Sequence, residues 1–358
     1  MNESNKRVII LGSGASRASK FALPTMSGFF GPIPSRYRPL FAFLKWFYPG
    51  LSKSEYNLEE VLAFVDLSRV RLPLWGEDRR AHTYRYEQIY ALILDYIHDR
   101  LQLPYGESCA LHERMVSRLD PLDSIITVNY DLVCDQALLK IEPGENDRPN
   151  QYSRIGKLPG LLHEQNLYGG FQPPGLMLRE TINGFYLKLH GSLDWIQCPT
   201  LNCRANMNIF STNLSTLASG QRAGQPCRFC GASLRTMIVP PVASKRLEDR
   251  GRLAFLWNMA LREIRKATEV VVIGLSLAPT DLEVRWLLRE GLDLRQRPVP
   301  RKQITIVNPS EKDVAQVVKC IPDGKYEIRM YDSMTAYVDS MALGFIHDVS
   351  GPDGEQKG

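Results

Sequence analysis

Four of the seven cysteines lie in two close pairs, at a spacing that suits a metal ion. Cys198 and Cys203 form the first pair, and Cys227 and Cys230 form the second, directly before Gly231. Four thiolates can bind zinc tetrahedrally, and four protein ligands make a closed, structural site. A glycine after the second pair suits a tight knuckle turn. Four unrelated buried cysteines are the alternative, but the pairing and the polar stretch between the pairs favour structural zinc.

A glycine-rich turn follows the first apolar run, Arg7–Leu11. Its residues are Gly12, Ser13, Gly14, Ala15 and Ser16. Glycines at this place would let a diphosphate approach the backbone, whose N–H groups can hydrogen-bond it. Arg17 stands where the usual dinucleotide fingerprint has its third glycine. The motif therefore fits phosphate binding and also fits a plain tight turn.

Polar residues with catalytic potential follow two further strand candidates. Asn129 and Asp131 come after Ser124–Val128, and His190 comes after Gly184–Leu189. An imidazole has an ordinary pKa near 6.5, which suits a general base. Asp131 equally suits a helix N-cap, and a lone histidine is more often structural. Both interpretations of these residues stay open on this evidence.

Small polar residues end two more apolar strand candidates, Glu269–Ile273 and Gln303–Val307. Gly274 and Ser276 follow the first candidate, and Asn308 follows the second. Residues of this kind at strand ends are what a nucleotide ribose and phosphate require. Each of them alone also fits ordinary loop punctuation.

The elements that must position these residues alternate along the chain. Two more strands are predicted at Met237–Val239 and Tyr326–Met330, and four helices separate or follow the later strands: Arg252–Lys266, Asp281–Glu290, Glu311–Lys319 and Ser333–Leu343. A long stretch from Phe30 to Arg118 is mostly helical by its apolar spacing. This alternation predicts an α/β fold, with a mostly parallel sheet that is covered on both faces and binds ligands at its strand ends.

Composition is that of an ordinary globular protein, with 44% hydrophobic and 23% charged residues and a net charge of +5 among 358 residues. The longest apolar runs fall short of the roughly 20 residues that a bilayer span needs. Val8–Leu11 is too short for a signal-peptide core, so we expect a cytoplasmic protein without a membrane segment. Basic clusters at Arg79-Arg80 and 295–302 fit a solvated surface better than a nucleic-acid contact.

Taken in order, the six segments quoted above resemble the sirtuin family. The resemblance runs from about Lys6 to Leu343, apart from the helical stretch. It implies a Rossmann-like, doubly wound NAD-binding domain made of residues 1–30, 119–197 and 236–345. A helical insertion would occupy residues 31–118, a zinc-ribbon module residues 198–235, and a disordered tail residues 346–358.

The resemblance also implies a role for each matching residue. Asn129 and Asp131 would contact the nicotinamide ribose, and His190 would be the general base. The diphosphate would lie against the first turn: Gly12, Ser13, Gly14, Ala15 and Ser16. The remaining contacts, to the diphosphate or the adenosine riboses, would come from two later strand ends: Gly274, Ser276 and Asn308.

Three departures separate the chain from the sirtuin deacylases. The Asp-x-Arg-like polar pair is missing between Lys20 and Phe30, Val128 replaces a glutamine, and 239–242 replaces a Phe-Gly-Glu stretch. These changes fall where an acyl-lysine peptide would dock. The chain resembles more closely the sirtuin-like domains of bacterial anti-phage defence proteins, which share its Thr-x-Asn-Tyr-Asp and Leu-His-Gly-Ser-Leu segments.

Members of that branch typically hydrolyse NAD within larger assemblies. The resemblance therefore implies an NAD hydrolase that releases nicotinamide and ADP-ribose and depletes NAD as a defence effector. A homo-oligomer is expected, together with a separate sensor or helicase-like ATPase subunit. The alternatives are an NAD-dependent protein deacylase and a non-catalytic regulatory subunit that binds NAD or ADP-ribose.

Overall fold

The computed structural model describes residues 6–25, 28–31, 34–71, 78–104, 106–120, 122–140, 161–162, 184–198, 200, 203, 209–211, 225–227, 229–238, 251–277, 281–293, 302–324 and 326–343. The predicted tail at 346–358 and the basic residues 295–301 lie outside these ranges. Lys302, the last residue of that basic cluster, is buried, so it belongs to no solvated surface.

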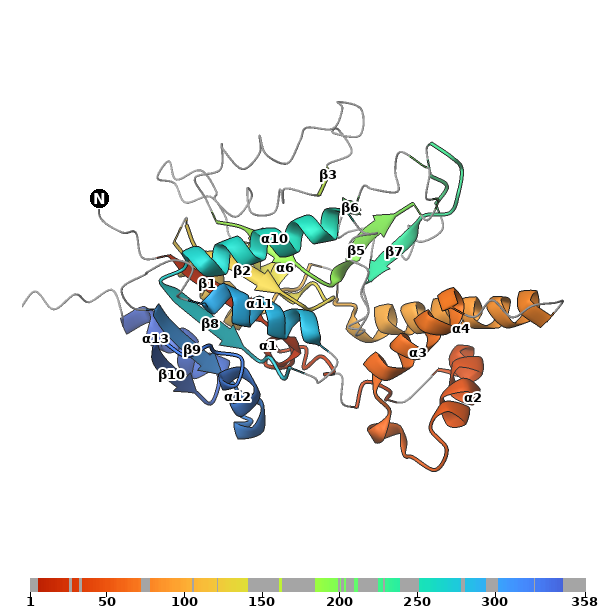
Figure 1. The fold of residues 1–358 in the computed structure, drawn as a ribbon, viewed down its shortest axis with the longest axis horizontal. Helices are drawn as coiled ribbons and strands as arrows, with labels where there is room; N and C mark the ends of the chain where they lie inside the picture. Colours follow the sequence, from red (N-terminus) through yellow and green to blue (C-terminus); the bar gives the residue numbers. More distant parts are fainter. Residues whose placement is uncertain are drawn as a thin grey trace, which may run out of the picture.

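A six-stranded sheet with every pairing parallel forms the centre of the protein (Figure 1). Its order is β10-β9-β8-β1-β2-β4. The strands have these bounds: β1 Arg7–Leu11, β2 Ser124–Thr127, β4 Tyr186–Lys188, β8 Glu269–Ile273, β9 Lys302–Val307 and β10 Tyr326–Tyr331. From β1 the chain builds outward to β2 and β4, and it then returns to add β8, β9 and β10 on the other side. The prediction of a mostly parallel α/β sheet is confirmed.

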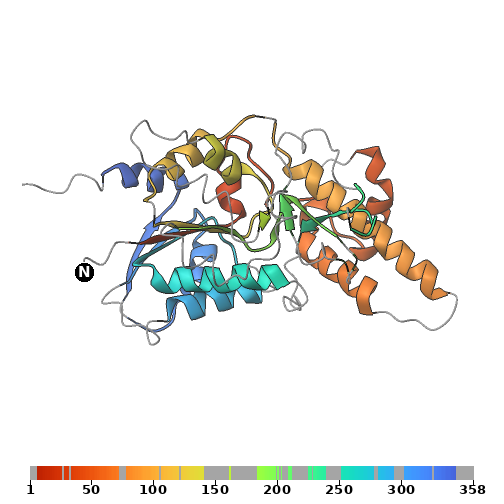
Figure 2. The ribbon, with the colours of Figure 1, turned by 90° about the horizontal axis from the view of Figure 1, so that it is seen from above.

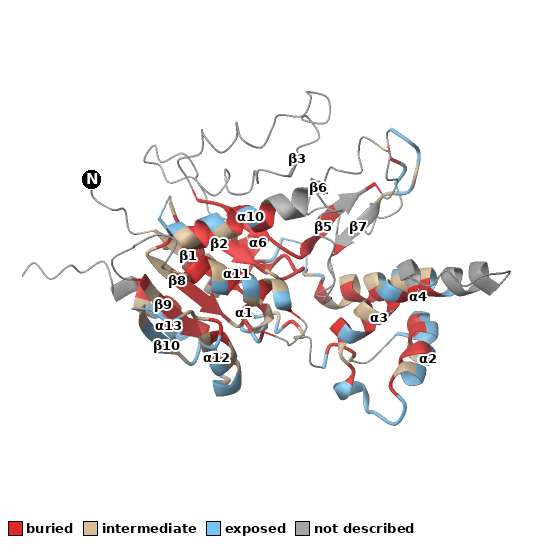
Figure 3. Cartoon of the chain, viewed as in Figure 1, coloured by how far each residue is buried: buried red, intermediate tan, exposed pale blue. Residues whose placement is uncertain are grey.

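Helices cover both faces of this sheet, as Figure 2 shows with the sheet seen on edge. One face carries α10 (Gly251–Lys266) and α11 (Leu282–Leu292), and the other carries α5 (Ala110–Ser117), α6 (Val133–Lys140) and α13 (Met334–Leu343). The short α1 is Ser13–Arg17, and α12 is Glu311–Val318. Runs such as Val270–Ile273 are buried, as a strand covered on both sides requires (Figure 3). Among the described helices, none has the length and apolar composition of a membrane span.

The helical insertion has a core of its own, built largely from aromatic rings. It contains η1 (Ser35–Tyr37), α2 (Arg38–Phe47), η2 (Lys53–Glu55), α3 (Leu58–Arg71) and α4 (Asp78–Leu101). Tyr96 of α4 stacks on Phe30 with ring centroids 5.7 Å apart and meets Tyr37 edge-on at 5.1 Å. In the aromatic segment 41–48, Phe43 and Tyr48 join this core, whereas Trp46 is 55% exposed. That segment is therefore mainly core.

A second, four-stranded sheet lies beside the first, in the order β3-β6-β5-β7. Its strands are β3 (Leu161–Leu162), β5 (Gly191–Gln197), β6 (Ile209–Ser211) and β7 (Arg235–Ile238). The strand predicted at Met237–Val239 as part of the parallel alternation belongs here, because β7 pairs antiparallel with β5. The prediction did not include β5, which begins at Gly191 directly after His190. Leu193 and Trp195 are buried in alternate positions of that strand.

The ends of β1 and β8 touch backbone to backbone through three glycines. The N–H of Gly12 donates to Ile273 O at 2.9 Å, and the N–H of Gly14 donates to Gly274 O at 2.9 Å. A Cβ on Gly274 would lie 2.3 Å from Ala15 N, and Gly274 has a φ of 62°. The glycines of both motifs are therefore required for chain packing, independently of any ligand.

Replacing Gly274 with alanine should destabilise the fold strongly. The positive φ costs roughly 1–2 kcal/mol for a residue with a Cβ, and the forced separation of the two strand ends adds about 1–3 kcal/mol. Gly50→Ala is the matched control, because Gly50 has a φ of 83° with nothing within 4 Å of its added Cβ. Urea unfolding should show the larger loss for Gly274→Ala. Equal losses in the two variants would contradict the packing role.

Candidate functional site

A cleft of about 650 Å³, including its open mouth, lies at the carboxyl edge of the six-stranded sheet. The strand ends are level there, since Leu11 is in register with both Thr127 and Ile273, and Thr127 with Lys188. Residues that follow these strands consequently meet, as expected for parallel strands. Six residues predicted for the site line the cleft: Ser13, Ser16, Asn129, Asp131, His190 and Ser276.

Asn129 links the second strand end to the glycine-rich turn. Its side-chain amide donates to Gly12 O and to Ser16 Oγ, both at 2.9 Å, and its backbone N–H donates to Thr127 Oγ1 at 3.1 Å. An asparagine amide carries two N–H donors. Since both donors are used within the chain, the carboxamide oxygen is the group of Asn129 that can serve a ligand.

Asp131 combines a capping role with a place in the cleft. Its Oδ1 accepts the N–H of Val133, the first residue of α6, at 3.0 Å, so Asp131 caps the helix from one residue before the N-cap position, which Leu132 occupies. Burial raises the pKa of the Asp131 carboxyl, while the charge of Lys188 and hydrogen bonds from Ser16 and Val133 lower it. A carboxylate in this position can stabilise a positively charged group of a ligand in the cleft.

His190 lies at the floor of the cleft between two aromatic rings. The rings of Tyr130 and Trp257 are centred 6.3 Å and 5.9 Å from the imidazole. His190 Nε2 lies 3.9 Å from Asp281 Oδ1, and both side chains are buried. At this distance the carboxylate can pair with the imidazole once the histidine has taken a proton.

Asp281 is a site residue that the sequence analysis missed. It occupies the N-cap position of α11, where its side chain makes no capping hydrogen bond, and it lines the cleft. The sequence predicts it only as the first residue of a helix. The signal that could have found it is its position: it opens the helix that follows the Gly274–Ser276 strand end.

The remaining predicted residues lie around the cleft in different ways. Gly12, Gly14 and Ala15 use their N–H groups inside the chain, Ala15 by donating to Gly12 O at 3.0 Å. Asn308 is not among the cleft-lining residues. Its amide donates to Leu275 O at 3.2 Å, and its Oδ1 accepts from the N–H of Ser310 at 3.0 Å. Asn308 therefore braces the neighbouring strand ends.

The segment that includes the helical insertion supplies another part of the cleft lining. Phe29, Glu59 of α3 and Leu101 of α4 all line it. These contacts place the segment at the cleft. It helps to define the space that a ligand can enter.

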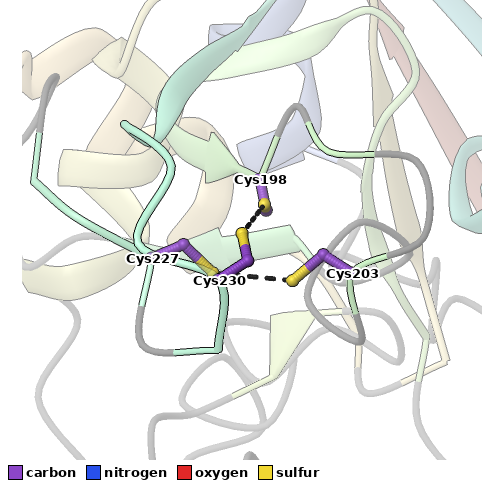
Figure 4. Close-up of side chains that lie close together, drawn as sticks. All are labelled: Cys198, Cys203, Cys227 and Cys230. Carbon is purple, nitrogen blue, oxygen red and sulfur yellow. Dashed lines mark hydrogen bonds between the residues drawn. The ribbon is translucent and has the colours of Figure 1, made fainter.

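The four paired cysteines converge on one point outside this cleft (Figure 4). The Sγ atoms of Cys198 and Cys230 are 3.5 Å apart, those of Cys203 and Cys227 are 3.7 Å apart, and all four lie within 4.8 Å of one another. Thiolates bound at about 2.3 Å around one tetrahedral ion lie about 3.8 Å apart. The cluster therefore has the donors and the size to hold a metal ion.

Backbone geometry around the second pair supports ligation. Gly231 has a φ of 72°, and its N–H donates to Cys227 O at 2.8 Å, which closes the expected knuckle turn. The Thr200 hydroxyl and the Ala232 N–H lower the pKa of the Cys230 thiol to about 6. A metal ligand must be deprotonated, so this environment favours binding.

Removing one thiolate should empty the cluster. We expect one metal ion per purified chain and close to none in Cys227→Ser, because three sulfur ligands hold the ion much less tightly than four. Cys320→Ser is the control, since Cys320 is also buried but lies outside the cluster. Elemental analysis by mass spectrometry gives the metal content. Equal metal in Cys227→Ser and the unmodified chain would exclude Cys227 as a ligand.

No protein-family model matches this chain, and no curated protein matches it. The resemblance to sirtuins stays a prediction that depends on the six sequence segments. Four of the six segments line the cleft: the first three and the Gly274–Ser276 strand end. The paired cysteines, which form a fifth segment, meet at the cysteine cluster.

Proposed function

We propose that this protein is an NAD hydrolase that cleaves the bond between nicotinamide and ribose. The observation that carries the proposal is the cleft, in which Ser16, Asn129, Asp131, His190 and Ser276 come together from four strand ends. Numbered in chain order, the strands run 3-2-1-4-5-6, which is the order of dinucleotide-binding sheets. We accordingly assign a Rossmann-like fold, with NAD across the point where the strand order reverses.

The reaction breaks the C1′–N bond of the nicotinamide ribose and forms a bond between C1′ and a water oxygen. Nicotinamide leaves as a neutral base with the bonding electron pair, so it needs little acid catalysis. Water loses one proton, and the products are nicotinamide, ADP-ribose and that proton. The transition state resembles an oxocarbenium ion, and the enzyme must orient the ribose and stabilise positive charge.

The cleft residues suit these tasks. The carboxamide oxygen of Asn129 can accept a hydrogen bond from a ribose hydroxyl or from water, since its N–H donors are held by Gly12 and Ser16. His190 can take the proton from water or from a ribose hydroxyl, and Asp281 stabilises the imidazolium that results. Asp131 contributes negative charge near the cationic ribose.

We assign the cysteine cluster to a structural zinc ion in a zinc-ribbon module. Four sulfur ligands leave no open position for substrate or water, so the ion would supply folding energy and no chemistry. By the resemblance, we further propose a cytoplasmic defence effector that depletes NAD as a homo-oligomer, with a separate sensor or helicase-like ATPase subunit.

Incubation with NAD alone, without an acyl-lysine peptide, should release nicotinamide and ADP-ribose. His190→Ala should lower the rate by about 10²–10⁴-fold, the usual contribution of a general base. His98→Ala is the control, because His98 lies on α4 outside the cleft lining. Chromatography of the products measures both rates. Full activity in folded His190→Ala would exclude this base, and NAD binding without turnover would indicate a regulatory subunit.

Replacing Asp281 with asparagine should lower kcat and leave NAD affinity nearly unchanged. The amide keeps the shape of the side chain but cannot stabilise the imidazolium, and partners of this kind contribute roughly 10- to 100-fold. Asp293→Asn, at the other end of α11, is the matched control. Steady-state kinetics and calorimetric titration separate kcat from affinity. A change in affinity alone would assign Asp281 to substrate binding instead.

A further inference from the structure

A fully buried lysine lies beneath the candidate active site. Lys188 is the last residue of β4, two positions before His190, and its side chain is 1% exposed. Its Nζ donates to the backbone oxygen of Asp131 at 2.7 Å and to Asp135 Oδ2 at 2.9 Å. Burial of an ammonium is costly unless the charge is paired and hydrogen-bonded. Both conditions are met here.

The contacts of Lys188 join the two segments that carry the proposed catalytic residues. The segment Asn129–Asp131 follows β2, and His190 follows β4, while Asp135 belongs to α6. Asp135 also accepts a hydrogen bond from the Tyr186 hydroxyl at 2.8 Å, which fixes the carboxylate that Lys188 binds. A displacement of the Asp131 backbone away from His190 would therefore break a charge-assisted hydrogen bond in a dry environment.

We propose that Lys188 is a positioning residue for NAD cleavage: its buried ammonium holds the Asp131 backbone beside β4 and places a positive charge beneath the Asp131 carboxylate. This inference rests on the proposed function. Lys188 lies behind the residues that line the cleft, so it acts through Asp131 and does not touch the substrate.

The electrostatics agree with this geometry. Burial raises the pKa of Asp131, Lys188 lowers it and Asp135 raises it. The other titratable groups that line the cleft are Glu59, Tyr130, His190 and Asp281. Loss of the Lys188 charge removes a stabilising partner of the carboxylate, so Asp131 should take up its proton at a higher pH.

A buried lysine elsewhere in the sheet provides a matched comparison. Lys302 begins β9, is 1% exposed, and donates to Ile264 O at 2.7 Å. Burial lowers its pKa to about 8. For Lys188, burial also lowers the pKa, but Asp135, Asp194 and Asp131 together raise it above the ordinary value. Lys302 thus has the burial and the backbone bond of Lys188 without its link to the cleft.

The test measures the ionisation of Asp131 directly and needs no NAD. Chains labelled with ¹³C at the aspartate carboxyl carbon are titrated by NMR, and Asp131→Asn identifies the Asp131 signal. In Lys188→Met the Asp131 midpoint should rise by at least one pH unit, whereas Lys188→Arg and Lys302→Met should leave it within a few tenths of the unmodified value. An unchanged midpoint in folded Lys188→Met overturns the proposal.

Kinetics supply the second readout. The acid limb of the kcat profile should move to higher pH in Lys188→Met by the same amount as the Asp131 midpoint, with a smaller change in KM. A uniform fall in kcat without a shift of the limb would mean that Lys188 only stabilises the fold. Absence of NAD cleavage in the unmodified chain would reject the proposed function, and the NMR titration would still decide whether Lys188 controls Asp131.

A double variant keeps the proposal testable if Lys188→Met does not fold. Removing Lys188 alone leaves Asp135 buried without its cation, which can cost several kcal/mol. Lys188→Met/Asp135→Asn removes both charges and keeps a hydrogen-bond acceptor for Tyr186. If the single variant does not fold, the proposal predicts that the double variant loses NAD cleavage relative to Asp135→Asn alone. Equal rates in those two chains overturn it.

Discussion

The close approach of the β1 and β8 ends determines where the rest of the site can lie. No side chain separates Gly12 and Gly14 from Gly274, and an added Cβ at Gly12 would come within 2.5 Å of Gly274 O. With its N–H donated to Ile273, Gly12 presents its carbonyl to Asn129. The contact between two backbones thus orients an amide on a third strand end. A cleft lined from four strand ends follows from this junction and from the level register of the parallel strands.

Electrostatics impose a second constraint, because buried acids line the cleft. Asp131 and Asp281 are both buried, and neither could keep a negative charge there without partners. Asp131 accepts hydrogen bonds from Ser16 and Val133, and the charge of Lys188 stabilises its carboxylate. Asp281 lies beside His190. In such surroundings each charge acts on its neighbours more strongly than in water. The arrangement is suited to a reaction in which positive charge develops and a proton moves, as proposed here for NAD cleavage.

Much of the central sheet could be predicted, since strands buried on both faces have continuous apolar runs such as Val270–Ile273. The strand ends could also be found from the sequence. The residues predicted there, Asn129 and His190, both line the cleft. The small sheet was not predicted as a unit, because β5 was missed and β7 was assigned to the parallel alternation, although β7 pairs antiparallel with β5. Local sequence placed Asp281 only at the start of a helix, and it assigned no role to Lys188. Both acquire their roles from residues that tertiary structure brings close, and the bond of Asn308 to Leu275 likewise depends on the neighbouring strand.

The helical insertion packs against the segments that carry the proposed catalytic residues. Tyr130 lies between Asn129 and Asp131 in sequence, and its side chain packs into the aromatic core of the insertion together with Leu132 and Val133. Leu193 of β5 joins that core just after His190. The two segments with the proposed catalytic residues therefore face the cleft on one side and the insertion core on the other. Any movement of α3 or α4 would be transmitted to Asn129, Asp131 and His190 through these packed side chains, since close-packed interiors transmit strain. The insertion is thus mechanically coupled to the proposed catalytic residues, and it also forms part of the cleft boundary.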